Sequence, residues 1–161
     1  METDIAFRYE PVSEDARAVR EMVAASGFFN PAEIEIAVEL VEERLEFGES
    51  SGYYFVFAEQ DGAVRGYTCY GPIAGTESSF DLYWIAVDPG GRGRGLGRLL
   101  MQETERIVRA VGGRRIYAET SGREQYAPTR RFYERLGFTR ETQLQDFYAP
   151  GDDKVFYVKP V

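Results

Sequence analysis

Apolar and polar residues alternate over several short stretches, and this pattern predicts seven strands. Such runs, bounded by Gly, Pro or Asp-Gly, are typical of β-strands. The predicted strands are Ile5–Glu10, Gly52–Glu59, Ala63–Tyr70, Phe80–Val87, Arg114–Thr120, Phe138–Tyr148 and Val155–Val158. The run Phe80–Val87 has apolar residues on both faces, which predicts a central strand covered on both sides.

Apolar residues spaced three to four positions apart predict two helices in the first half of the chain. Ser13 is a potential cap for the first helix, and Gly27 would end it. The second begins at Asn30-Pro31-Ala32-Glu33, which combines a cap, a proline in the first turn and a glutamate at the third position. Its expected buried stripe is Ile34, Val38, Val41 and Leu45.

Two further helices are predicted in the second half. One ends at Gly112-Gly113, and its expected inner positions are Leu96, Leu99, Leu100, Ile107 and Val111. The other covers Pro128–Leu136, with Gly137 at the C′ position and Phe138 available for the accompanying apolar contact.

The predicted element order is β-αα-βββ-α-β-α-ββ, an α/β fold. Because a helix joins the strands Phe80–Val87 and Arg114–Thr120, these two are expected to be parallel, with a right-handed crossover. The fold predicted is a mixed central sheet of about seven strands with helices on both faces. A length of 161 residues fits one domain over residues 1–161.

Composition excludes several kinds of chemistry. The chain has no histidine and a single cysteine, Cys69, so catalysis by Ser-His-Asp or Cys-His groups and zinc sites that use histidine are excluded. With no apolar run long enough to span a membrane and no signal peptide, the sequence predicts a cytoplasmic protein without a membrane partner. No metal site is expected.

Charge is distributed unevenly along the chain. Residues 1–90 contain 18 acidic and 5 basic residues, whereas residues 91–161 contain 9 acidic and 14 basic ones. One half could attract a cation and the other an anion, although acidic surface helices also simply keep a protein soluble. The net charge of −8 argues against a nucleic-acid partner.

A loop with five glycines and three arginines joins the apolar strand Phe80–Val87 to the following helix. Such a junction presents backbone N–H groups, a helix N-terminus and positive side chains, which together favour binding of an anion, above all a pyrophosphate. The loop ends in Gly97-Arg98-Leu99 and lacks the Lys-Ser/Thr of a P-loop. No three of its alternate glycines have the G-x-G-x-x-G spacing of a dinucleotide site, although Glu119 lies near the place of a ribose-binding acid.

The run Val87 to Leu100, Val-Asp-Pro-x-x-Arg-Gly-x-Gly-Leu-Gly-x-Leu-Leu, resembles the acyl-coenzyme A loop of the GNAT N-acetyltransferases. The resemblance covers nearly the whole chain through the element order, and it is strongest from Phe80 to Phe138. It implies acetyl-coenzyme A as co-substrate and transfer of an acetyl group to a primary amine. A non-catalytic acyl-coenzyme A sensor of the same fold is the alternative.

The resemblance also implies the cofactor-binding residues. Backbone amides from about Gly93 to Arg98 would hold the pyrophosphate, and arginine side chains would neutralise it or the ribose phosphate. Strand residues before the loop would lie beside pantetheine, with the Val87 N–H as a donor to the thioester carbonyl. The full set is Ile85, Ala86, Val87, Arg92, Gly93, Arg94, Gly95, Leu96, Gly97 and Arg98.

Acyl transfer to an ammonium needs a base for the amine and an acid for the leaving thiolate. The run Phe132 to Phe138 resembles the second family motif, whose tyrosine protonates coenzyme A sulfur, and this position is Tyr133. The chain also looks similar to bacterial enzymes that acetylate the N-terminus of a ribosomal protein, and there a glutamate at the position of Glu119 serves as base. The ordinary alternatives are a packed helix tyrosine and a carboxylate paired with an arginine.

The sequence indicates less clearly which residues would bind the acceptor amine. Phe29, Asp81, Tyr83 and Tyr148 are the candidate substrate-binding residues, and Asp81 and Tyr83 are also weaker candidates for the base. The acidic first half predicts a cationic amine such as a peptide N-terminus, lysine, polyamine or aminoglycoside. Cys69, within a regular strand and without a histidine, is not expected to form an acyl-enzyme, so direct attack in a ternary complex is preferred. The oligomeric state is expected to be a monomer or a homodimer.

Overall fold

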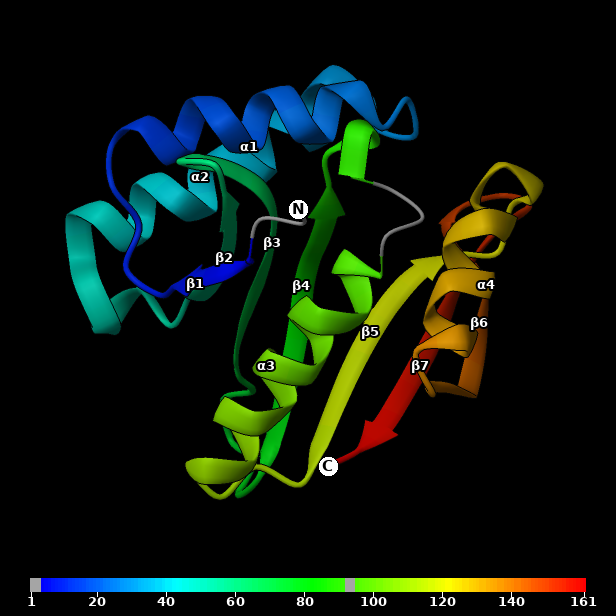
Figure 1. Ribbon diagram of the computed structural model, residues 1–161. Helices are drawn as coiled ribbons and strands as arrows, with labels where there is room; N and C mark the ends of the chain where they lie inside the picture. The colour runs from blue at the N-terminus through cyan, green and yellow to red at the C-terminus, as the bar shows by residue number, and fades with distance from the viewer. Residues whose placement is uncertain (1–3, 92–94) are drawn as a thin grey trace. The chain divides into compact units, whose positions relative to one another are not determined.

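A computed structural model describes residues 4–91 and 95–161 of the chain. Its helices and strands follow the predicted order (Figure 1). The strands are β1 (Ala6–Arg8), β2 (Tyr54–Gln60), β3 (Ala63–Pro72), β4 (Ser79–Val87), β5 (Arg115–Ser121), β6 (Thr139–Ala149) and β7 (Asp152–Pro160). The α-helices are α1 (Glu14–Ala25), α2 (Pro31–Phe47), α3 (Leu96–Ala110) and α4 (Ala127–Arg135).

The strands form one hydrogen-bonded series in the order β1-β2-β3-β4-β5-β7-β6. The β4–β5 pair is parallel, with Ser79, Phe80 and Asp81 opposite Arg115, Ile116 and Tyr117, whereas the β1–β2, β2–β3, β5–β7 and β6–β7 pairs are antiparallel. The mixed seven-stranded α/β arrangement and the parallel pair are therefore confirmed.

The chain folds into two compact units. The first draws on residues 1–71 and 84–104, and the second on residues 72–83 and 105–161. Both β4 and α3 contribute residues to each unit. The interpretation of residues 1–161 as one acetyltransferase domain stays a prediction.

In the first unit, α1 and α2 lie side by side (Figure 1) and enclose a core with β2 and β3. The predicted start of α2 is confirmed, because Asn30 accepts a hydrogen bond from the Glu33 amide at 2.9 Å and Glu33 accepts one from the Asn30 amide at 3.1 Å. The predicted stripe is wrong at Leu45, which is 43% exposed. Arg44 occupies the buried position beside it and reaches Glu10 at 2.6 Å.

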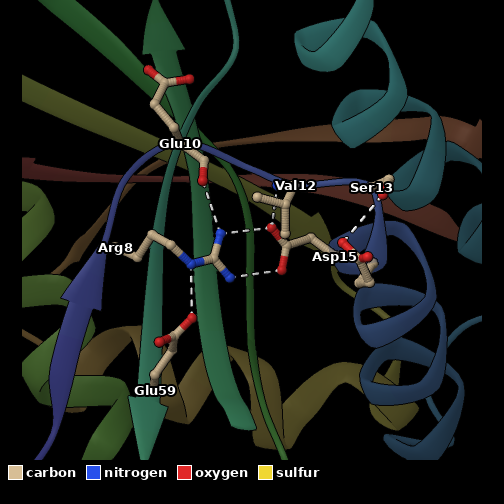
Figure 2. Close-up of polar contacts among 7 residues, drawn as sticks. Arg8, Glu10, Val12, Ser13, Asp15 and Glu59 are labelled. Atoms are coloured by element: carbon tan, nitrogen blue, oxygen red, sulfur yellow. Dashed lines mark hydrogen bonds and ion pairs between the residues drawn. The ribbon is translucent and has the colours of Figure 1, made fainter. Parts of the chain in front are cut away.

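A charged cluster fixes the start of α1 to the sheet (Figure 2). Arg8 donates to both carboxylate oxygens of Asp15, to the Glu10 carbonyl and to Glu59, over distances of 2.7–2.8 Å. Asp15 is 2% exposed and also accepts the Val12 amide. The expected Ser13 cap is wrong, because Ser13 already has helical dihedral angles and its hydroxyl donates to Glu14 instead. The carboxylate of Asp15 supplies the local hydrogen bond.

The predicted inner side of α3 is confirmed at Leu96 and Leu100, which are buried, and is wrong at Leu99 and Val111, which are 40% and 67% exposed. Met101, Thr104 and Val108 are buried as well. The reason is that Thr104 is an interior residue despite its hydroxyl, which lies 2.7 Å from the hydroxyl of Thr68. A polar residue with an interior partner does not stand out in a pattern based on hydrophobicity.

In the second unit, α4 lies beside the β6–β7 hairpin (Figure 1). The predicted end of α4 is confirmed. The Phe138 amide donates to the Tyr133 carbonyl at 3.0 Å and the Gly137 amide to that of Glu134 at 3.1 Å, the bonds of a Schellman motif. Gly137 has a φ of +93°, which glycine adopts readily.

β4 is central in the strand order, but the expectation that both its faces are covered is wrong. Among its nine residues only Leu82 is buried, and Tyr83 is exposed. Its register with β5 extends from Ser79 to Asp81, over the first third of the strand. A mostly apolar run therefore corresponds here to a strand whose later side chains are half-buried or exposed rather than sealed in a core.

Candidate functional site

The end of β4 leads into a tightly held turn in the first unit. Ile85, Ala86 and Val87 are all half-buried. The Asp88 amide then donates to the Arg65 carbonyl at 2.7 Å, and the Asp88 carboxylate accepts the Gly90 amide at 3.2 Å and contacts the Arg65 guanidinium at 3.3 Å. Arg65 and Asp88, which the sequence pattern did not single out, anchor the entrance to the glycine-rich loop.

The start of α3 is suited to an anion. The Leu99 amide donates to the Gly95 carbonyl at 3.0 Å, which is the first helical bond, so the amides of Leu96, Gly97 and Arg98 have no acceptor within the helix. Gly95 has a φ of +73° and is exposed, and so is the Arg98 side chain. The predicted residues Arg92, Gly93 and Arg94 lie outside the described residues.

Gly66 on β3 allows α3 to approach the sheet at this point. A Cβ at residue 66 would lie 2.9 Å from Leu100 Cδ1, 3.0 Å from the Ala86 carbonyl and 3.4 Å from Leu96 Cδ2. The helix that starts at the candidate anion site and the strand beside it thus both pack against this glycine. A glycine within a strand pattern is a sequence signal for such a close approach.

Tyr133, the predicted acid, lies in the second unit with its ring packed. It is 6% exposed, and its ring centroid lies 5.5 Å from that of Phe138 and 5.7 Å from that of Tyr157. Burial raises its pKa well above the ordinary tyrosine value, so the hydroxyl keeps its proton at neutral pH. Among the described residues, no hydrogen bond uses this hydroxyl, which leaves it available as a donor.

Glu119, the predicted base, is paired with a lysine rather than with an arginine. Its Oε2 lies 2.7 Å from Lys154 Nζ, and its side chain is 39% exposed. Asp81 on β4 is half-buried, and burial raises the pKa of its carboxyl, with a further increase from Glu119 and an opposing effect of Lys154. The structure therefore brings two of the predicted residues, Asp81 and Glu119, into one electrostatic cluster.

The acid and base candidates lie on opposite faces of the β5–β7 ladder. Neighbouring residues in paired strands share a face, and successive residues alternate between faces. Tyr157, which packs against Tyr133, is opposite Ala118, whereas Glu119 is opposite Phe156. Tyr133 therefore packs against the face opposite to that of Glu119, so the structure does not bring these two predicted residues together on one face of the ladder.

The candidate acceptor-binding residues are divided between the units. In the first, Phe29 packs on Trp84 with ring centroids 4.8 Å apart, at the edge of the core. In the second, Tyr83 is 38% and Tyr148 48% exposed, and the ring of Tyr148 stands perpendicular to that of Phe147 at 5.1 Å. A substrate-binding role for these residues stays a prediction.

Cys69 is fully buried, and burial raises the pKa of its thiol well above the ordinary value. A thiolate nucleophile is disfavoured at this position. Within residues 4–91 and 95–161, no group of three or more Cys, Asp or Glu side chains is arranged to hold a metal ion. Over the same ranges, no helix has the length and apolar character needed to cross a bilayer.

Comparisons with known proteins place this geometry in a family. The model of the acetyltransferase (GNAT) family matches residues 18–138. A mycothiol acetyltransferase of Amycolatopsis mediterranei is 31% identical over 150 residues, which cover 88% of this chain and 48% of that protein. The chain spans about half the length of the curated relatives it matches.

Solved structures similar to this chain indicate the same family and fold. A crystal structure of a protein of the GNAT family from Desulfovibrio desulfuricans is 51% identical, covers 98% of this chain and 99% of its own, and superposes with a TM-score of 0.94. A ribosomal-protein-alanine N-acetyltransferase from Brucella melitensis has a TM-score of 0.74 at 23% identity, with 97% and 99% covered, and shares the fold. Coenzyme A or acetyl-coenzyme A is bound in several other structures of this fold. The predicted resemblance is confirmed, and the chain belongs to the acetyltransferase (GNAT) family.

Proposed function

We propose that the chain is an N-acetyltransferase that moves the acetyl group of acetyl-coenzyme A to a primary amine by direct attack. The observation that carries this proposal is the junction of β4, the glycine-rich loop and α3. Three amides at the start of the helix, from Leu96 to Arg98, face no helical acceptor, and an exposed guanidinium stands beside them. These groups fit a pyrophosphate, which accepts hydrogen bonds from backbone amides and binds arginine.

The residues of the junction have separate roles in this proposal. The amides of Gly93 to Arg98 and the side chains of Arg92, Arg94 and Arg98 hold the phosphates. Ile85, Ala86 and Val87 line the pantetheine, and the Val87 N–H stabilises the oxyanion formed when the amine adds to the thioester carbonyl. Their support is the match of the family motif to this sequence together with the half-buried state of the three strand residues.

Proton transfer is assigned to Glu119 and Tyr133. Glu119 removes a proton from the acceptor ammonium, directly or through a water molecule, and Tyr133 donates one to the departing thiolate. The support for these roles is the match of the second family motif at Tyr133 and the exposed position of the Glu119 carboxylate on β5. The raised pKa of Tyr133 keeps the donor form populated.

Direct attack is preferred to a covalent acyl-enzyme, because the chain's one cysteine is fully buried with a raised thiol pKa. For the acceptor, we propose a cationic amine bound by Phe29, Asp81, Tyr83 and Tyr148. The exposed aromatic rings of Tyr83 and Tyr148 and the half-buried carboxylate of Asp81 support this assignment. Aromatic rings and carboxylates are the groups that recognise an ammonium.

Two measurements test the proposal. Isothermal titration calorimetry of the purified protein with acetyl-coenzyme A should detect binding, and its absence at millimolar ligand would remove the proposal. Release of coenzyme A thiol should then be followed with a panel of spermidine, kanamycin, lysine and an alanyl peptide. Binding without turnover on any amine would favour the non-catalytic sensor.

A further inference from the structure

Lys154 on β7 is held on three sides in the second unit. Its Nζ lies 2.7 Å from Glu119 Oε2, and it stands over the rings of Phe147 and Phe156 at 4.2 and 4.7 Å from their centroids. Its side chain is only 12% exposed. Lysine is rarely buried to this extent unless it is paired, and a cation over aromatic rings is additionally stabilised. The ammonium therefore has a defined position.

Strand register explains why Lys154 meets this carboxylate. In the β5–β7 pair, Glu119 is opposite Phe156 and Ser121 is opposite Lys154, so Lys154 is the diagonal neighbour of Glu119 on the same face. Asp81 is level with Tyr117 in the parallel β4–β5 pair, two residues before Glu119. Asp81, Glu119 and Lys154 thus follow one face across three neighbouring strands.

Without Lys154, the carboxylates of Asp81 and Glu119 would lie on this face with no ammonium between β5 and β7 to balance them. Near Glu119, the titratable side chains on it are Asp81 from β4, Tyr117 and Glu119 from β5, and Lys154 from β7. The carboxylates that precede Lys154 on β7, those of Asp152 and Asp153, have other partners. Asp152 accepts from Ser121 and pairs with Arg123, and Asp153 accepts from Gln143 and from the Asp146 amide. Asp81 and Glu119 are then left beside the ammonium of Lys154, whereas Arg115, on the same face of β5, lies four residues before Glu119. Carboxylates that share a site without a cation compete for a proton.

We propose that Lys154 is a positioning residue for the base of the acetyl transfer: it holds Glu119 through Oε2 and places a cation beside Glu119 and Asp81, so that Glu119 Oε1 faces the acceptor ammonium and accepts its proton. This inference rests on the proposed role of Glu119. Lys154 gains no proton and loses none in the step, because the proton passes from the substrate nitrogen to the carboxylate. The lowering effect of Lys154 on the pKa of Asp81 agrees with this role.

The kinetic test uses a double-mutant cycle. Thiol release with the most active amine of the panel is compared for the wild type, Lys154→Met, Glu119→Gln and the double variant. Lys154→Met should lower kcat by about 10- to 100-fold, a fraction of what a general base supplies, with the KM for acetyl-coenzyme A unchanged. Lys154→Arg, which keeps the charge, should restore part of the loss. Arg20→Met is the matched control, because it removes the cation of an exposed ion pair with Glu35.

The outcomes separate the inference from the proposed function. If Lys154 acts through Glu119, the double variant is no slower than Glu119→Gln, whereas a further loss would overturn the inference. If Glu119→Gln keeps the wild-type rate and pH profile, the assignment of the base itself fails, whatever Lys154→Met does.

A ligand-free measurement gives a second route that needs no acceptor amine. Carbon-13 NMR of the side-chain carboxyl of Asp81 is followed against pH in the wild type and in Lys154→Met. Removal of the ammonium should move the Asp81 midpoint to higher pH, because Lys154 lowers that pKa in the wild type. An unmoved midpoint in a folded variant would overturn the inference that Lys154 acts as the cation of this cluster.

Discussion

Replacing Tyr67 with Phe should make the protein more stable. Tyr67 is 0% exposed, its ring lies about parallel to those of Phe55 and Phe57 at 6.3 and 6.0 Å, and Cys69 belongs to the same core cluster. Its hydroxyl oxygen has no hydrogen-bond partner among the described residues. Burial also raises its pKa far above the ordinary value, so the group stays neutral and buried.

The magnitude follows from the transfer of one hydroxyl. A hydroxyl that is buried without a hydrogen-bond partner lowers the free energy of unfolding by about 1–3 kcal/mol in mutational data. Removing its one oxygen atom loses little dispersion energy. The Phe variant should therefore gain about 1–2 kcal/mol in the free energy of unfolding. For a protein of this size, that corresponds to a rise in Tm of roughly 2–8 °C.

Tyr157→Phe is the matched control. Tyr157 is also 0% exposed, but its hydroxyl donates to Glu134 at 3.0 Å, so its removal should destabilise the protein by about 1 kcal/mol. Both variants and the wild type are compared by thermal melting and by urea titration. The reasoning is refuted if Tyr67→Phe loses stability as Tyr157→Phe does, since the Tyr67 hydroxyl would then be hydrogen-bonded in solution, for example to a buried water.

Three further predictions concern the site and its support. Tyr133→Phe should lower the rate of thiol release by about 10- to 100-fold and leave the calorimetric affinity for acetyl-coenzyme A unchanged. Because the pKa of Tyr133 is raised, any alkaline fall in the wild-type rate that is due to this residue should begin above pH about 10. An equal loss of affinity would assign Tyr133 to cofactor binding. Gly66→Ala should destabilise by about 1–3 kcal/mol and weaken acetyl-coenzyme A binding, because its Cβ would meet the Ala86 carbonyl at 3.0 Å. Gly122→Ala, whose closest atom would be 3.4 Å away, is the stability control, and equal losses would contradict the steric argument. Asp15→Asn should cost about 2 kcal/mol in urea unfolding, since it removes the buried carboxylate that binds Arg8 through two oxygens, and a change below the error of the titration would show that the cluster contributes nothing.

Local signals in the sequence predicted the ends of elements well. The cap at Asn30 and the positive φ at Gly137 involve residues within five positions of each other, so their chemistry is legible in a short window. The seven strands and the parallel crossover followed from periodicity and order. Because the glycine spacing before α3 is also local, the candidate anion-binding junction could be located, and the family comparison confirmed the resemblance drawn from it.

Contacts that depend on register or on burial could not be predicted. The pairing of Glu119 with Lys154 joins positions 35 residues apart and exists only because β5 and β7 are neighbours with one particular alignment. Similarly, Thr104 is interior through its partner Thr68, which moved the buried side of α3 away from Leu99. A hydrophobicity pattern contains neither kind of information.

The Schellman motif at the end of α4 also constrains how this protein can diverge. Tyr133 supplies the carbonyl that accepts the Phe138 amide, while its ring contacts the Phe138 ring at 5.5 Å. The backbone that ends the helix and the side chain proposed for the chemistry thus belong to one six-residue block, Tyr133 to Phe138. In a chimera or a family recombination library, a crossover inside this block should separate the proposed proton donor from the turn that orients it. A block exchanged whole should keep its geometry.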